Sequence, residues 1–429
     1  QWLRRNQRYR EPAFLPHIVA RRLIHLFCHG RFVVVNSDPL WRSRLFVSLR
    51  EQARLLERTA GEAPEGLPRI ESAAALALSG LCLEDNSLRL TAGLGMLETE
   101  LSRQILPDGG AIDRSPYTLA EVFRLLVMVM DTMVEAGEEV PQFLHNAHDR
   151  MAPTIRFFRH GDGKLALFNG GAEGDDDTLS WLLSHDDARG KPFAFARHSG
   201  YQRLLAGRTL VLFDCGVPPP GPFSCHAHAG CLAFELSAGP QRIVVNCGAA
   251  ALPCHRKWET VLRATAAHST ATLADTSNAT FLPAGWLSRL LGKRLFGGPT
   301  DVETSRAESP RGWTVVASHN AYVPRFGVRH ERELTLSPQG LALTGIDRFY
   351  PVVRRRAPLP FAVRFHIHPD VRLSRAQGGD ILLKLPNGEG WRFRAGGPVS
   401  VEESVYLGGE QVRKTEQLVL TGSVGEGPA

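Results

Sequence analysis

The apolar spacing along the first part of the chain is typical of amphipathic helices. Leucine or isoleucine recurs at three- and four-residue intervals at Leu90, Leu94, Leu97, Leu101 and Ile105. This face predicts one helix, which ends at the breaker Pro-Asp-Gly-Gly over 107–110. Ala73 to Cys82 and Thr118 to Val134 predict two further helices, both apolar enough to be buried. Such a series favours an incomplete α/α toroid or a helical layer, and periodicity does not separate these two.

From about residue 155 the pattern changes to short runs rich in β-branched and aromatic residues, bounded by Gly, Pro and Asp. The runs are Thr209–Asp214, Cys231–Ser237, Arg242–Asn246, Trp313–Ser318, Glu333–Leu336, Ala362–His368 and Ile381–Leu385. Asn387-Gly388 after the last run is a tight-turn signal. Many strands without intervening helices predict a β-sandwich, and we expect the chain after about residue 160 to be essentially strand.

The two patterns predict an α+β protein of two domains. We place a helical, α/α toroid-like domain at residues 1–152 and a large antiparallel β-sandwich domain at residues 153–429. The switch falls between residues 145 and 165, after Pro153 and before the turn His160-Gly161-Asp162-Gly163. A length of 429 residues also favours two cores over one.

Composition narrows the class of protein. A hydrophobic fraction of 43% and a charged fraction of 22% describe a globular chain. No apolar stretch approaches the roughly 18 residues of a membrane span. The net charge of +6 suits an anionic partner such as an acidic polysaccharide. The same charge is compatible with nucleic acid or with solubility alone, and nothing else in the sequence points to nucleic acid.

The cysteines do not predict a disulfide framework. The seven cysteines form no Cys-x-x-Cys pair, and an odd number cannot all pair internally. Five of them fall between residues 215 and 254. We interpret them as small buried apolar side chains.

The candidate chemistry centres on residues 225–236, Cys-His-Ala-His-Ala-Gly-Cys-Leu-Ala-Phe-Glu-Leu. On an extended segment His226 and His228 would point to the same side, where one imidazole can bind a metal and the other exchange protons. Asn246 ends an apolar strand, and His268 precedes another. This spacing is compatible with one metal ion held by His228, Asn246 and His268. The His-x-His pair alone is equally compatible with packed or surface histidines.

Taken in order, these segments resemble the heparinase II/III-like family. The motifs are His-Ala-His-Ala-Gly (226–230), Phe-Glu-Leu-Ser (234–237), Ile-Val-Val-Asn-Cys-Gly (243–248) and Arg-Ala-Thr-Ala-Ala-His-Ser-Thr (263–270). Segments 197–201, 330–332, 345–347 and 364–369 are also similar to the family. The resemblance covers roughly residues 155–370, and the segment 104–117 is similar to the family's helical part.

The resemblance implies a helical toroid followed by stacked antiparallel sheets, with a catalytic cleft between them. It implies cleavage of an acidic, uronic-acid-containing polysaccharide by β-elimination. In this reaction the C5 proton leaves beside a neutralised carboxylate, and the bond to the 4-oxygen then breaks. Carried over to this chain, His226 is the catalytic histidine and Tyr117 the candidate proton-exchanging tyrosine. His228, Asn246 and His268 match the metal positions, for which we expect zinc.

Three further residues are candidates for substrate contact. Arg114 lies in the loop before Tyr117, and we expect both to face His226 across the cleft. His198 and Tyr201 lie in the similar segment 197–201.

Several positions depart from the family pattern. The catalytic tyrosine generally follows Ser-Pro after one intervening residue, whereas Tyr117 follows Pro116 directly. Tyr117 is therefore alternatively an aromatic residue that packs at the start of a helix. Asn246 stands where the family often has Asp, and an Asn-His-type pair is missing upstream of the loop Asp108-Gly109, near residues 66–69. These departures keep open a non-catalytic carbohydrate-binding or envelope polysaccharide-associated protein on the same scaffold. A glycoside hydrolase would need two facing carboxylates, and no convincing pair is found.

The remaining features leave alternatives open. His366 and His368 predict either a second metal site or an ordinary satisfied pair, and 354–356 (Arg-Arg-Arg) either a sugar-binding or a solvated loop. The resemblance implies a periplasmic or cell-envelope location. A cytoplasmic location also stays open, because Gln1-Trp2-Leu3-Arg4-Arg5 does not read as a signal peptide. The oligomeric state is not predicted.

Overall fold

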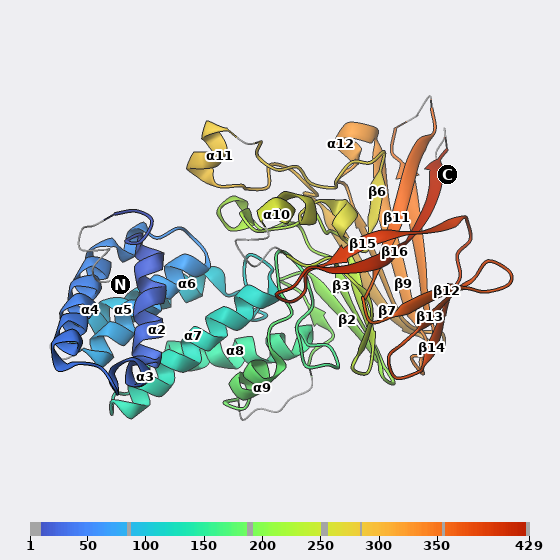
Figure 1. Cartoon of the computed structure of the whole chain (residues 1–429). Coiled ribbons are helices and arrows are strands. Elements are labelled where there is room, and N and C mark those ends of the chain that lie inside the picture. The colour runs from blue at the N-terminus through green and yellow to red at the C-terminus, as the bar shows by residue number, and fades with distance from the viewer. Residues whose placement is uncertain are drawn as a thin grey trace. The chain divides into compact units, whose positions relative to one another are not determined.

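The protein is described by a computed structural model that covers residues 10–83, 87–186, 192–249, 256–283, 285–353 and 357–425 (Figure 1). The chain forms two compact units. The first consists of Gln1–Gly109, Thr118–Ala152 and His185–Ala188, and the second of Gly110–Tyr117, Pro153–Ser184 and Arg189–Ala429. The loop Gly110–Tyr117 thus belongs to the second unit, whereas the sequence placed it in the helical domain.

The N-terminal part of the chain is helical. Its helices are α2 (Pro16–Cys28), α3 (Gly30–Val34), α4 (Pro39–Thr59), α5 (Leu67–Cys82), α6 (Ser87–Gln104), α7 (Pro116–Glu135) and α8 (Gln142–Phe158), with a 3-10 turn η1 (Ala60–Glu62). The three helices predicted from spacing are confirmed as α5, α6 and α7. Local sequence explains the start of α4, where the Asp38 side chain accepts a hydrogen bond from the Trp41 amide and Pro39 occupies the first turn.

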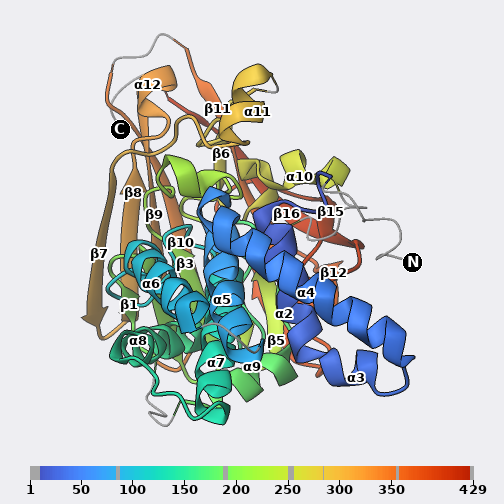
Figure 2. The ribbon, with the colours of Figure 1, turned by 90° about the vertical axis from the view of Figure 1, so that its left-hand side faces the viewer.

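Helices α5 and α6 pack unusually closely, side by side in Figure 2. A Cβ atom on Gly80 would lie 2.5 Å from the Leu90 nitrogen, and one on Gly93 would lie 2.3 Å from the Ala77 nitrogen. Only glycine therefore allows the two backbones to approach this far. Of the predicted apolar face of α6, Leu97 and Leu101 are buried.

The helix α8 continues through Pro153 to Phe158, so the predicted boundary after residue 152 falls inside a helix. After residue 160 we expected a chain that is essentially strand, and the described residues there contain short helices in addition to the strands. In the described part of this region the short α-helices are α9 (Asp176–Leu183), α10 (Arg256–Leu262), α11 (Trp286–Leu291) and α12 (Val323–Phe326). None exceeds 8 residues. Such short helices carry too little periodicity to be read from sequence.

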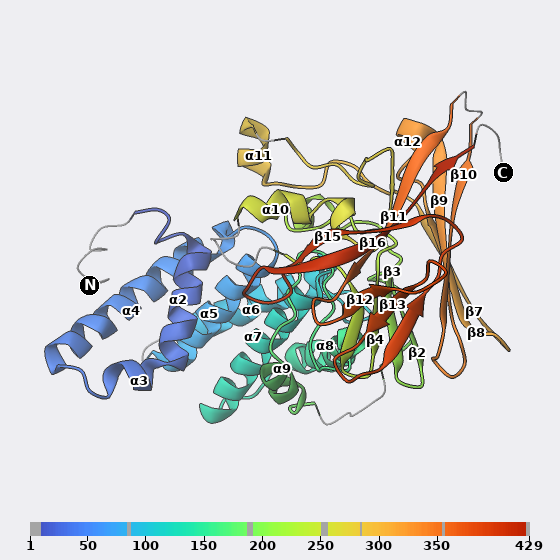
Figure 3. The same cartoon turned by 45° about the vertical axis from the view of Figure 1, so that its right-hand side comes forward.

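The strands in the described residues of the second unit form three antiparallel sheets (Figure 3). The nine-stranded sheet has the order β1-β2-β3-β4-β5-β11-β16-β15, with β6 also paired to β11. Its strands are β1 (Phe195–Ala196), β2 (Tyr201–Ala206), β3 (Thr209–Asp214), β4 (Phe234–Ala238), β5 (Gln241–Val245), β6 (Ala271–Leu273), β11 (Leu359–Ile367), β15 (Val399–Tyr406) and β16 (Arg413–Val424). The four-stranded sheet contains β7 (Val302–Ser309), β8 (Gly312–His319), β9 (Val328–Leu336) and β10 (Leu343–Pro351). The three-stranded sheet contains β12 (Arg372–Arg375), β13 (Ile381–Lys384) and β14 (Gly390–Phe393).

One apolar core joins the three sheets. It contains Phe213 and Phe234 of the nine-stranded sheet, Val315 and Leu334 of the four-stranded sheet, and Leu383 of the three-stranded sheet. Stacked antiparallel sheets around a shared core agree with the predicted fold class. Each predicted run overlaps an observed strand. The turn at Asn387-Gly388 is confirmed, with Gly388 at φ 88°.

Two negative predictions can be compared with the structure. Among the described residues, no helix combines the length and the apolar character needed to cross a bilayer. The cysteines within the described residues are free thiols: Cys28, Cys82, Cys215, Cys225, Cys231 and Cys247. Cys254 and the arginines 354–356 lie outside the described residues.

Candidate functional site

Two loops of the second unit bring His228 and His268 together. His228 lies between the 3-10 turn η2 (Gly221–Ser224) and β4, and His268 lies between the 3-10 turn η4 (Thr265–Ala267) and β6. The Nδ1 atom of His228 is 3.1 Å from the Nε2 atom of His268. The sequence predicted this approach of residues forty positions apart, at a separation of about 3–4 Å for two nitrogens that bind one zinc ion.

The hydrogen bonds around the pair fix its tautomers. His268 Nδ1 lies 2.9 Å from the Ala264 carbonyl oxygen, which can only accept, so this nitrogen carries the proton. In the neutral ring Nε2 of His268 is therefore an acceptor, and Nδ1–H of His228 donates to it. The second nitrogen of His228, Nε2, keeps its lone pair. Among the described residues it has no hydrogen-bond partner.

Burial keeps both rings uncharged at neutral pH. Desolvation, reinforced by the neighbouring His268, lowers the pKa of His228 well below its usual value. Desolvation likewise lowers the pKa of His268 to about 4, although the hydrogen bond to Ala264 opposes it. The pair is therefore a neutral, polarised unit with one unused lone pair.

His226 and His228 do not share a face as expected. Both lie in a loop without regular structure, so the alternation of a strand does not apply, and His226 is exposed while His228 is buried. The backbone of this loop runs against Gly170, where an added Cβ would lie 2.7 Å from the His226 carbonyl oxygen.

Tyr117 borders the same turn. An added Cβ on Gly170 would lie 3.5 Å from the His226 Cβ, and one on the next residue, Gly171, would lie 3.6 Å from the Tyr117 Cβ. The two predicted catalytic residues thus flank two consecutive glycines of one unit. Tyr117 is half-buried and His226 exposed.

Asn246 does not direct its oxygen toward the histidine pair. Its Oδ1 accepts from the Ser269 amide at 3.0 Å, and its Nδ2 donates to Glu235 Oε1 at 3.1 Å. Glu235 is fully buried in β4 and also accepts from the Leu167 amide, while its Oε2 lies 3.0 Å from His160 Nε2. Asn246 therefore links β5 to the loop that carries His268. The signal for Glu235 was present in the sequence, as a carboxylate inside an apolar run.

The donor set at the histidine pair is smaller than a structural zinc site requires. Two imidazole nitrogens approach one another, and the third expected donor is engaged elsewhere. Among the described residues, no three His, Cys, Asp or Glu side chains are grouped so that they could hold a metal ion. Zinc binding at His228, Asn246 and His268 stays a prediction, which elemental analysis of the purified protein would test.

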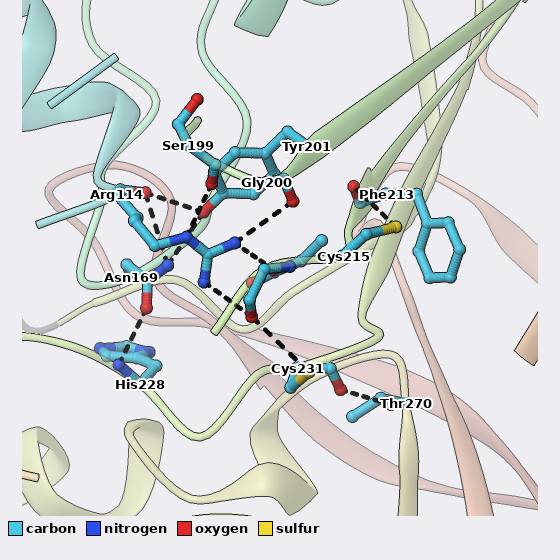
Figure 4. Close-up of polar contacts among 12 residues, drawn as sticks. Arg114, Asn169, Ser199, Gly200, Tyr201, Phe213, Cys215, His228, Cys231 and Thr270 are labelled. Carbon is cyan, nitrogen blue, oxygen red and sulfur yellow. Dashed lines mark hydrogen bonds and ion pairs between the residues drawn. The ribbon is translucent and has the colours of Figure 1, made fainter. Parts of the chain in front are cut away.

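Arg114 is a buried anchor of the Gly110–Tyr117 loop (Figure 4). Its guanidinium donates to the carbonyl oxygens of Ser199 and Gly216, at 2.8 and 3.2 Å, and forms an ion pair with Asp214. Burial opposes its charge, but Asp214 raises the pKa of Arg114 above its usual value. With its donors directed into the protein, Arg114 is not placed for the substrate contact that the sequence suggested.

Tyr201 is also internal, and Asn169 connects it to the histidine loop. The Tyr201 hydroxyl donates to the Arg114 carbonyl oxygen at 2.8 Å. Asn169 Nδ2 donates to that hydroxyl, and its Oδ1 accepts from the His228 amide at 3.2 Å (Figure 4). Of the predicted substrate contacts only His198 is exposed. Asn169 was missed, since Asn-Gly-Gly reads only as a turn.

The ion pair between Arg332 and Asp347 contacts both histidine loops. Arg332 on β9 donates through Nη1 to the carbonyl oxygens of Leu232 and Ser269, at 2.8 and 2.7 Å. Its other nitrogens bind Asp347 on β10, which also accepts from His330 Nε2 at 2.7 Å. Arg332 therefore contacts the loop of His228 and the residue after His268. These are the segments 330–332 and 345–347 that resembled the family.

His366 and His368 are explained without a metal. His366 donates from Nε2 to the Ala266 carbonyl oxygen at 3.0 Å, and its Nδ1 accepts from the Ser404 hydroxyl at 2.7 Å. His368 Nδ1 accepts from the Asp370 amide at 3.3 Å.

Comparison with known proteins identifies the family of the chain. Residues 188–429 match the family described as heparinase II/III-like, C-terminal. The chain belongs to the heparinase II/III-like family. A relative, FtsZ-localized protein C of Caulobacter vibrioides (strain NA1000 / CB15N), is 32% identical over 437 residues, which cover 99% of this chain and 74% of the relative.

Solved structures of this family have the same fold. The crystal structure of heparinase III matches with a TM-score of 0.73 and 14% identity over 99% of this chain and 70% of that chain. A mutant of the heparan sulfate lyase HepC from Pedobacter heparinus matches with a TM-score of 0.66 and 16% identity over 99% and 69%. Both share the helical N-terminal region followed by antiparallel sheets.

Proposed function

We propose that this protein is a polysaccharide lyase that cleaves an acidic, uronic-acid-containing polysaccharide by β-elimination. The observation that carries the proposal is the juxtaposition of Tyr117 and His226 at the Gly170–Gly171 turn. The neutral His228–His268 pair lies in the same loop system. Membership in the heparinase II/III-like family supports this reaction class.

In the proposed reaction Tyr117 and His226 exchange protons with the sugar. A base removes the C5 proton, the electron pair forms the C4–C5 double bond, and the C4–O bond breaks as the leaving oxygen takes a proton from an acid. We assign the proton exchange to Tyr117, with assistance from His226. The His228–His268 pair sets the position of the His226 loop. The low pKa values of His228 and His268 keep this pair neutral at pH 7.

The test is a panel of acidic polysaccharides, with the ultraviolet absorbance of unsaturated uronates as the signal. His226→Ala should lower turnover at least about 100-fold, the usual scale for one acid–base group. The far-ultraviolet circular dichroism spectrum should stay unchanged, because His226 is exposed. His25→Ala, in α2 of the first unit, is the matched control and should keep full turnover. Full turnover in His226→Ala would make this residue structural.

A second candidate function rests on a different observation, the 32% identical relative named FtsZ-localized protein C. We propose as the alternative a non-catalytic, envelope polysaccharide-associated protein that localises with FtsZ. The departures at Tyr117 and Asn246 favour this reading. Co-sedimentation with FtsZ polymers, together with the polysaccharide panel, separates the two. The alternative is supported if the His226→Ala variant still co-sediments with FtsZ polymers. The unmodified protein should then produce no absorbance of unsaturated uronates on any polysaccharide of the panel. A periplasmic or cell-envelope location belongs to the lyase proposal and is tested by fractionation of cells that produce the protein.

A further inference from the structure

A polar cavity of about 260 Å³ lies in the second unit, near the start of β5. Its polar lining includes Asp162, Lys164, Glu173, Arg242, His368, Asp370 and Arg413. None of these side chains takes part in the histidine site. Five residues of largely extended chain, about 16 Å, separate Gln241 at this cavity from Asn246 beside Ser269.

The carboxylates of the cavity have their hydrogen bonds satisfied. Asp162 accepts from the Lys164 amide at 3.0 Å and twice from the Arg242 guanidinium, at 2.8 and 3.2 Å. Glu173 accepts from Lys164 Nζ at 2.7 Å and from the Tyr406 hydroxyl. The acceptor side of the site is therefore largely used within the protein.

The donors, in contrast, are not used up. Arg242 is 3% exposed, and its Nη1 is buried without a hydrogen-bond partner in the described structure. A buried donor on a charged group that lacks a partner destabilises the folded chain more than a neutral one does.

His368 adds a second free donor. Desolvation lowers its pKa to about 4, so the ring is neutral at pH 7. Its Nδ1 accepts from the Asp370 amide, so the proton resides on Nε2. This Nε2 atom has no hydrogen-bond partner among the described residues. Lys164 and Arg413 each bind one carboxylate, Glu173 and Asp370 respectively.

We propose that this cavity binds a small oxyanion, as a free ion or as the carboxylate of a single sugar residue. The unused groups are all donors, which selects a ligand made of acceptors. The cavity is smaller than the roughly 300–1,000 Å³ of sites for drug-sized ligands, which restricts the ligand to one ring or less. The three cationic side chains of the lining (Lys164, Arg242 and Arg413) are balanced by three carboxylates (Asp162, Glu173 and Asp370). Recognition of the anion therefore depends on hydrogen-bond geometry more than on net charge.

The test measures binding of glucuronate, sulfate, phosphate and uncharged glucose to the whole chain by titration calorimetry. We expect at least one anion to bind with a Kd of about 1 mM or tighter. Lys164→Gln and Arg413→Gln should each weaken it about tenfold. Both side chains are over 40% exposed, so these variants should fold. A preference for glucuronate over sulfate and phosphate identifies a sugar carboxylate, and the reverse order identifies a free ion.

Lys293→Gln is the matched control, because Lys293 forms an ion pair of the same 2.7 Å length with Glu259 in the same unit. It should leave binding unchanged. Absence of saturable binding for all three anions overturns the proposal, as does equal weakening in the Lys293→Gln control or equal affinity for glucose. The binding of anions in His226→Ala should equal that of the unmodified protein, so a failure of the lyase proposal leaves this test intact.

Discussion

The buried histidines of the second unit make its stability depend on pH. The pKa of His268 is lowered from 6.5 to about 4 in the folded chain, whereas the unfolded chain titrates near 6.5. Between these values the unfolded state binds more protons, so acid favours unfolding. The contribution of His268 is present above pH 6.5 and is lost as the pH falls through about 4. Its full size is about 3 kcal/mol.

We therefore expect the free energy of unfolding to decrease steadily as the pH is lowered from about 7.5 to about 4.5. His268→Gln should reduce the pH dependence of the free energy of unfolding by the contribution of this one histidine. The control is His198→Gln, which removes an exposed imidazole from the same unit. Urea denaturation at several pH values measures all three proteins. Parallel curves for His268→Gln and the unmodified protein would contradict the assignment of this proton uptake to His268.

The turn between Tyr117 and His226 should tolerate no side chain at Gly170. Its φ of +79° is strained for any other residue, and an added Cβ would meet the His226 carbonyl oxygen at 2.7 Å. Gly170→Ala should cost about 1–3 kcal/mol and displace the His226 loop. Gly221→Ala in η2, with nothing within 4 Å of its added Cβ, should behave as the unmodified protein. Denaturation midpoints measure the cost, and an unchanged midpoint in Gly170→Ala would show that the turn yields freely.

At the scale of elements, the contact between α5 and α6 depends on the position of each glycine. Gly93→Ala would place a Cβ 2.3 Å from the Ala77 backbone nitrogen, so the helices must separate. We expect a loss of about 1–3 kcal/mol. Gly95→Ala on the same helix meets nothing within 4 Å and should gain about 0.5–1 kcal/mol from helix propensity. Thermal denaturation should show shifts of opposite sign, and shifts of the same sign would refute the close packing.

Elements with a strong period were predictable, and most of the site geometry was not. The α6 leucines and the strand Thr209–Asp214 follow their patterns, because burial of one face or of both decides the structure. The pairing of His228 with His268 was also foreseen. The environment of His226 was not, because it lies in a loop where no period operates. Arg114 was misassigned for a related reason. An arginine in a loop looks available to ligands until the fold reveals Asp214 a hundred residues away.

At the scale of the whole molecule, the Arg332–Asp347 ion pair connects the four-stranded sheet to both histidine loops. Arg332→Met should lower the free energy of unfolding by about 3–5 kcal/mol, because it leaves a buried carboxylate without its cation. The double variant Arg332→Met with Asp347→Asn removes both charges and keeps an acceptor for His330. It should recover part of the loss. Urea denaturation checks both, and a double variant no more stable than the single one would contradict this explanation.

The loop Gly110–Tyr117 has a consequence for how this protein can be divided and recombined. The chain enters the second unit at this loop, returns to the first, and enters the second again at Pro153. A gene cut at the obvious helix-to-strand boundary would send Arg114 away with the helical fragment and leave Asp214 buried without its cation. If the helical part is exchanged between two relatives, the loop Gly110–Tyr117 must therefore come from the same protein as the sheet that contains Asp214. A chimaera that respects only the linear order of helices and strands should therefore fail to fold.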